Sequence, residues 1–227
     1  MKAMNDLNRL LAFPLEQIPF VLLVLLIAFT LHEFAHAYTA YKFGDPTPKR
    51  MGRVTLNPRV HLDVLGTILI FIAGFGWAKP VLINRSHFRH PRTMGIIVSA
   101  AGPISNLLIS FAGLVIAHLM FSYGWLEGAS VGVQKAVTVF LDILIRLNMV
   151  LFIFNLIPLP PLDGYHIVEN LLPREWAIRL QQVQHWAIVI FLLIVFIPPL
   201  NQATIGPLFA LGGRLLRAFQ VFLGNII

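Results

Sequence analysis

Hydrophobic residues along this chain are gathered into long runs, and polar, turn-rich stretches separate the runs. A helix that crosses a bilayer needs about 20 predominantly apolar residues. Two runs near the C-terminus, at 186–200 and 205–222, predict additional membrane helices over about 184–224. The pattern therefore predicts an all-α polytopic membrane protein. The runs that are long enough to span on their own cover residues 18–43, 93–121 and 135–157.

Two shorter segments depart from this pattern. The apolar run at 64–78 has only 15 residues, so it predicts a re-entrant segment that dips into the bilayer and returns to the same side. Residues 51–56 alternate between apolar and polar positions, which predicts a short β element. The run at 205–222 carries two arginines, so it either spans the bilayer or lies in the interface.

Composition supports the membrane interpretation. Of the 227 residues, 57% are hydrophobic and 12% are charged, and the mean hydropathy is +0.78. Soluble domains have about 45–50% apolar and about 25% charged residues. The charges are too few to cover a soluble globule, which excludes an ordinary soluble enzyme, a disordered protein and a fibrous protein. The chain has no cysteine, which excludes disulfides, thiolate metal ligands and a cysteine nucleophile.

The sequence His32-Glu33-Phe34-Ala35-His36 lies inside the first apolar run. Histidines at i and i+4 lie on one face of a helix, where both imidazoles can bind one zinc ion. Glu33 follows the first histidine and can reach a water molecule at the metal as a general base. Because burying three ionisable side chains in an apolar helix is costly without a function, we interpret His32 and His36 as metal ligands.

A catalytic zinc site has three protein ligands, so a third is expected elsewhere in the chain. Asp163 follows a proline-rich break at the end of the run at 135–157, and such breaks are tolerated at membrane depth only beside protein or water. Asp163 is therefore the first candidate, and the nearby His166 is a weaker one. Asp142 is four residues from Arg146 and is better explained by an ion pair.

Together these motifs resemble the site-2 protease family of intramembrane zinc metalloproteases, in its compact prokaryotic form without a PDZ or CBS domain. The resemblance covers about residues 20–166 and implies a three-helix catalytic core, at about 18–166, within a single domain over 1–227. It also implies one Zn²⁺ per chain held by His32, His36 and Asp163, with Glu33 as catalytic acid/base. Asn155 matches an asparagine that contacts substrate or the oxyanion. The matching sequences are HEFAH, GRVTLNP at 52–58, HLD at 61–63, GWAKP at 76–80, AGPISN at 101–106 and NLIPLPPLDG at 155–164.

Other residues have less specific roles. We expect Arg53, Val54 and Thr55, in the predicted β element, to bind an unwound substrate by strand addition. Asn106 is expected to hydrogen-bond two helices at a close crossing. His61 and Asp63 precede the short run, and they could line a water route, form a second metal site or belong to a polar network.

Positive charge is distributed unevenly, which bears on topology. The formal net charge is +7, and nine of the 17 Lys and Arg residues lie within residues 42–92, on both flanks of the short run. The loop at 122–134 has neither Lys nor Arg. Because basic loops stay in the cytoplasm, we expect both flanks, and with them the active site, to face the cytoplasmic side of the cell membrane. The basic stretch at 79–92 is expected to contact anionic lipid head groups, and no nucleic-acid partner is expected.

The predicted function is hydrolysis of peptide bonds in transmembrane substrates. A membrane metal transporter could also place histidines and an aspartate in a bilayer, but it would not need Glu33 beside the first ligand. A catalytically inactive binding protein is the other alternative, although both histidines, Glu33 and Asp163 are all present. The substrate and the oligomeric state, including a homo-oligomer, stay open.

Overall fold

The structure is a computed structural model and describes residues 11–73 and 76–225. Three of its helices are long and apolar enough to cross a membrane. They are α2 (Ile18–Lys42), which follows the 3₁₀ turn η1 (Leu15–Gln17), α5 (Pro91–Ser122) and α6 (Val131–Asn155). All three apolar runs expected to span are therefore helical, within four residues of the predicted ends.

Local sequence explains where these helices begin and end. Pro19 and Pro91 occupy the first turns of α2 and α5, where a missing backbone N–H is tolerated. The Ser130 hydroxyl accepts a hydrogen bond from Val133 N at 3.4 Å and caps the start of α6. At its other end α6 stops three residues before Pro158, because proline cannot continue the helix.

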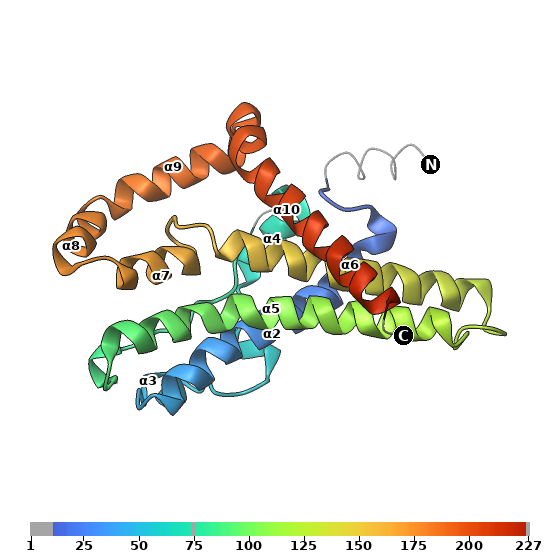
Figure 1. Cartoon of the computed structure of the whole chain (residues 1–227), viewed down its shortest axis with the longest axis horizontal. Helices are drawn as coiled ribbons and strands as arrows, with labels where there is room; N and C mark the ends of the chain where they lie inside the picture. Colours follow the sequence, from blue (N-terminus) through green and yellow to red (C-terminus); the bar gives the residue numbers. More distant parts are fainter. Residues whose placement is uncertain (1–10, 74–75, 226–227) are drawn as a thin grey trace.

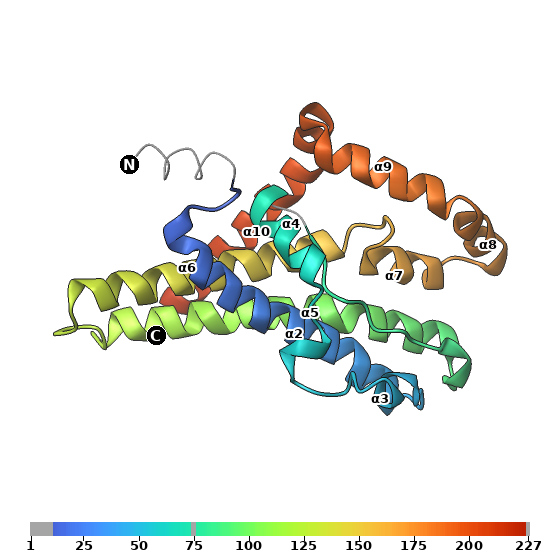
Figure 2. The same ribbon diagram turned by 180° about the vertical axis from the view of Figure 1, so that it is seen from behind.

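The three long helices pack against one another around buried aliphatic side chains. Helices α5 and α6 run side by side and are joined by a hairpin (Figure 1), and α2 crosses α5 on the face seen in Figure 2. Val24 of α2 packs with Leu141 and Leu144 of α6. Between α5 and α6, the Ser110 hydroxyl donates to Ile145 O at 2.8 Å. These contacts bring α2 against the middle of the α5–α6 pair, which confirms the helical core.

The connection between α2 and α5 contains two short α-helices, two 3₁₀ turns and extended chain. Helix α4 packs on α2 through Ile70, which joins the cluster of Val21, Leu25 and Phe29. Behind α4 the chain turns back, so that Lys79 N donates to His61 O at 2.8 Å. The short helices are α3 (Thr47–Arg50), α4 (Val64–Ala73), and the 3₁₀ turns η2 (Pro58–Val60) and η3 (Arg85–His87).

Two predictions for this connection need correction. Residues 51–56 form turns rather than the predicted β element, and no strand occurs in the part of the chain that the structure describes. The reason is local: Gly52 adopts a φ of 67°, and Arg53 N donates to Pro48 O, which closes a turn. The re-entrant segment is not supported either. Within the run at 64–78, the described residues form the ten-residue helix α4 and, from residue 76 on, chain without helix or strand, while residues 74–75 lie outside the described part.

The C-terminal part is also helical. Helices α8 (Arg174–Gln182) and α9 (Gln184–Phe196) meet at a bend of 64° and together could form one further span. Helix α10 (Pro198–Gly224) packs on α6 and α5, where Leu223 joins Leu114 and Ile145. Helix α10 is not apolar enough to count among the candidate spans. Between α6 and α8, α7 (Asp163–Leu171) lies beside the first half of α5 (Figure 1).

Candidate metal centre

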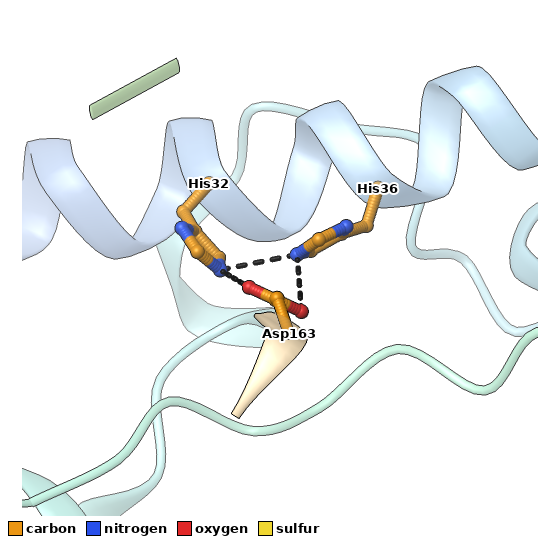
Figure 3. A group of neighbouring side chains, drawn as sticks. All are labelled: His32, His36 and Asp163. Carbon is orange, nitrogen blue, oxygen red and sulfur yellow. Dashed lines mark hydrogen bonds and ion pairs between the residues drawn. The ribbon is translucent and has the colours of Figure 1, made fainter. Parts of the chain in front are cut away.

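His32, His36 and Asp163 meet at one point between α2 and α7. The two histidines lie one turn apart on one helix and face Asp163 (Figure 3). Asp163 is the first residue of α7, directly after the proline-rich break. The Nε2 atoms of His32 and His36 are 3.1 Å apart. Asp163 Oδ2 lies 3.1 Å from His32 Nε2, and Oδ1 lies 3.2 Å from His36 Nε2. Three predicted ligands are thus brought together from positions 127 residues apart (163 − 36).

Both imidazoles are oriented by hydrogen bonds on the side away from this point. His32 Nδ1 lies 2.7 Å from Asn106 Oδ1, and His36 Nδ1 lies 2.7 Å from Val98 O. Because both partners are oxygen acceptors, each Nδ1 carries the proton. The Nε2 lone pairs then point toward Asp163, in the tautomer that binds a metal.

This arrangement fits a zinc ion. Two Nε2 lone pairs and a carboxylate face one another, and Asp163 Oδ2 is buried and accepts no hydrogen bond. Such a cluster of acceptors needs a cation. Bonds of about 2.0 Å to a tetrahedral zinc would separate the ligand atoms by roughly 3.3 Å, close to the distances found. A Cβ placed on Gly102 would lie 2.2 Å from His36 Nε2 and 2.6 Å from His32 Nε2, so glycine keeps the space between α5 and the histidines open.

Glu33 lies beside the cluster and is buried, with 7% of its surface exposed. Its Oε2 accepts a hydrogen bond from Val81 N at 3.1 Å and lies 3.8 Å from Arg53 Nη2. Arg53 is itself 3% exposed and donates to Val60 O and Lys79 O. The carboxylate of Glu33 is therefore held in place by the extended chain after α4 and by a buried guanidinium.

A cavity of about 580 Å³ opens onto these residues. His32, Glu33, His36 and Asp163 line one side, and much of the extended chain at 76–83 lines another. The volume is sufficient for a short stretch of extended polypeptide, since ligand pockets are commonly 300–1,000 Å³. The cavity thus gives a substrate access to the candidate metal centre.

The other predicted site residues are placed differently. Asn155 ends α6 and lines the cavity, while its side-chain amide donates to Leu151 O at 2.9 Å. Arg53, Val54 and Thr55 are not among the residues that line it. Because the described residues 51–56 form turns and not a strand, their predicted role in strand addition has no support in the fold.

His61 and Asp63 take part in local hydrogen bonds. His61 is fully buried, and its Nε2 lies 2.7 Å from Thr55 O. Burial lowers the pKa of His61, and the nearby charge of Arg53 lowers it further. Asp63 accepts from Gly66 N at 2.8 Å at the start of α4. The one His/Asp/Glu cluster suited to a metal among the described residues is His32, His36 and Asp163, so the polar network is the favoured alternative for this pair.

One polar residue of the core was not identified from the sequence patterns. Asn148 of α6 is fully buried, and its Oδ1 accepts from Asn106 Nδ2 at 3.0 Å. Its own amide donates to Leu144 O at 2.8 Å. A chain of hydrogen bonds therefore runs from α6 through Asn106 to His32. An asparagine in the middle of an apolar run was the available signal.

A second network holds α7, the helix that carries Asp163. Arg85 donates to Glu169 Oε2 at 2.9 Å and to Asn170 Oδ1 at 3.1 Å, and it lies 3.1 Å from His166 Nδ1. Burial favours the neutral form of Glu169, but the hydrogen bond from Gln181 and the charge of Arg85 outweigh it and lower the pKa of Glu169. His166 belongs to this network and not to the metal cluster.

Comparison with known proteins identifies the family. Residues 132–198, which include Asp163, match Peptidase family M50. YwhC of Bacillus subtilis, which is named as a zinc metalloprotease, is 47% identical over 208 residues, covering 91% of this chain and 93% of its own. The chain belongs to peptidase family M50, the site-2 protease family. Rip2 of Mycolicibacterium smegmatis, also named as a zinc metalloprotease, is 29% identical and covers 83% of this chain and 72% of its own. No solved structure shows a significant match.

Membership of this family confirms the resemblance inferred from the motifs. The chain is a metalloprotease of the multi-pass membrane type, and Zn²⁺ is its cofactor, as the relatives' names and the His–His–Asp cluster agree. A membrane protease acts in a lipid environment on membrane substrates.

Proposed function

We propose that the protein hydrolyses peptide bonds of transmembrane segments at a zinc ion held by His32, His36 and Asp163. The observation that carries the proposal is the convergence of these three side chains beside Glu33, on a cavity large enough for a peptide. Zinc, when bound, supplies a Lewis acid that polarises the scissile carbonyl and makes water acidic enough to lose a proton near neutral pH.

Glu33 moves the proton in this mechanism. Its carboxylate takes a proton from the attacking water and passes it to the leaving amine, as a general base and then a general acid. The hydrogen bond from Val81 N and the nearby Arg53 guanidinium hold the Oε2 atom. The other oxygen, Oε1, is proposed to exchange the proton with water and the leaving amine.

Asn155 is proposed to stabilise the developing oxyanion. Asn155 lines the cavity, and its side-chain amide donates to Leu151 O within its own helix. Rotation about the side chain would release this amide to a substrate oxygen. Removing one such donor typically costs about 100–1,000-fold in kcat.

The orientation in the membrane is proposed from charge. The hairpin between α5 and α6 contains no Lys or Arg over residues 122–134. Basic residues lie instead at the C-terminal end of α2, at Lys42, and in the first turn of α5, at Arg92. Because α4 is too short to cross, the basic residues on both its flanks lie on the same side. The positive-inside rule makes that side cytoplasmic, and the active site opens toward it.

The test is zinc content and cleavage measured on one preparation of the full chain. We expect near-stoichiometric zinc, and cleavage of a model transmembrane peptide by the unchanged protein. Glu33→Gln should keep the zinc and lose cleavage by at least about 1,000-fold, whereas the exposed Glu127→Gln should change neither. Zinc binding with transmembrane metal flux and no cleavage would instead identify a transporter.

A further inference from the structure

A second cavity, of about 260 Å³, lies between α7, α8 and the start of α5. We call it the arginine pocket, since three arginines from different elements line it. Arg85 precedes α5, Arg92 belongs to its first turn, and Arg174 begins α8. Only Arg85 also borders the cavity at the metal centre. The remaining residues of the arginine pocket are Glu169, Asn170, Ala177, Ile178 and Gln181.

The arginine pocket has an excess of positive charge that the protein itself leaves unbalanced. Its one carboxylate, Glu169, pairs with Arg85 and accepts a further hydrogen bond from Gln181 at 2.5 Å. In the described part of the chain neither Arg92 nor Arg174 forms an ion pair. Two guanidinium groups are thus free to bind an anion, and the N-terminal end of the 32-residue helix α5 adds a favourable dipole.

The surroundings favour an anion that belongs to a membrane lipid. Trp176 of α8 is 59% exposed, and Arg179 stacks over its ring at 5.1 Å. Exposed tryptophan beside arginine is typical of helices at the membrane–water interface. Ala177 and Ile178 add apolar surface to the arginine pocket, next to the charged groups. A lipid head group presents both phosphate and apolar chain to such a surface, whereas a free anion presents only charge.

We propose that the arginine pocket binds the phosphate of an anionic phospholipid head group, chiefly through Arg92 and Arg174. The bound lipid would bridge α5 and α8. Because Arg85, Glu169 and Asn170 also hold α7, the head group would stabilise the network that positions Asp163. The arginine pocket lies outside the candidate metal centre, and lipid binding there does not depend on the proposed reaction.

Native mass spectrometry of the full chain tests this site. Micelle-extracted protein carrying Glu33→Gln is mixed with phosphatidylglycerol or with phosphatidylcholine, and bound lipids are counted. The test variant is Arg92→Gln with Arg174→Gln, and the matched control is Arg214→Gln with Arg217→Gln on α10. We expect the test variant to bind phosphatidylglycerol about 25-fold more weakly, roughly fivefold for each arginine, and the control to be unchanged.

Three outcomes decide the question. Loss of phosphatidylglycerol in the test variant alone, with no competition by 10 mM inorganic phosphate, supports the lipid site. Competition by inorganic phosphate at that concentration would show a site for a soluble anion and overturn the lipid assignment. Equal loss in both variants, or no loss, would overturn the arginine pocket as a binding site. Circular dichroism of each variant checks that the helices are retained.

Discussion

His32 Nδ1 and Asn106 Oδ1 are 2.7 Å apart in the interior, where Asn106 is fully buried. This contact ties the first histidine of α2 to α5, and Asn148 extends it to α6. The three core helices therefore share one line of hydrogen bonds that ends at the candidate metal centre. Its expected effect is to hold the His32 ring in the tautomer with a free Nε2.

Asn106→Leu is expected to lower zinc affinity by about 10–100-fold, because the His32 ring loses the acceptor that orients it. The measurement is zinc retained against a graded chelator. Ser110→Ala is the control, since it removes a buried hydrogen bond that α5 makes to α6 without touching His32. Equal zinc loss in both variants would mean that general helix packing, and not ring orientation, is responsible.

Asn148→Ala provides an intermediate case. It leaves the Asn106 amide without its partner at 3.0 Å, while the contact between Asn106 and His32 can persist. We expect zinc affinity between that of the unchanged protein and that of Asn106→Leu. An effect larger than that of Asn106→Leu would contradict the proposed order of the hydrogen-bond chain.

Gly102→Ala is expected to displace the metal. The added methyl group would lie 2.2 Å from His36 Nε2, and both histidines would have to move. Overpacking of this kind costs about 1–3 kcal/mol, or up to about 100-fold in zinc affinity. Zinc content measured by atomic emission checks this. Gly132→Ala on α6, where the nearest atom is 4.0 Å away, should bind zinc normally.

The stability of the protein in detergent is expected to fall on acidification, in part through His61. Its folded-state pKa lies below the ordinary value of about 6.5, so the unfolded chain binds the proton more readily. This contribution is complete above about pH 6.5 and is lost as the pH falls toward the lowered value. Thermal midpoints between pH 7.5 and 5 should decline less steeply in His61→Gln. Parallel slopes for the two proteins would contradict this, and the exposed His90→Gln serves as control.

The chain has no cysteine, which allows orientation to be tested by single introduced thiols. Glu127→Cys lies in the hairpin between α5 and α6, and Arg50→Cys ends α3; both positions are exposed. A membrane-impermeant maleimide added to intact cells should label the first position and not the second. The reverse pattern would place the active site on the outer side.

Sequence patterns located the helices well because apolar runs and proline are local signals. Asn155 and Pro158 show this at the end of α6. The same reasoning failed at residues 51–56, because a strand depends on a neighbouring strand, which alternation alone does not show. At the C-terminal end, helix α9 ends at Phe196, inside the predicted run at 186–200. Helix α10 then begins at Pro198 instead of at the predicted position 205.

The candidate ligands could be named in advance, since their types and spacing carry the chemistry. The residues that hold the ligands in place through hydrogen bonds and ion pairs could not all be identified from the sequence. Asn148 contacts a residue 42 positions away, and Arg85 reaches Glu169 across 84 positions. Such pairs depend on how helices cross, which a single sequence does not specify.

The position of the histidines along α2 also gives the depth of the candidate metal centre in the membrane. His36 and His32 precede Lys42, the basic end of the helix, by six and ten residues, which corresponds to about 9 and 15 Å at 1.5 Å per residue. Where Lys42 marks the membrane surface, the reaction takes place between a third and a half of the way across a hydrocarbon layer of about 30 Å. A helical substrate is then expected to be cut roughly six to ten residues inside its cytoplasmic boundary. The fragment on the cytoplasmic side of the cut would keep only these few apolar residues, too few to hold it in the bilayer.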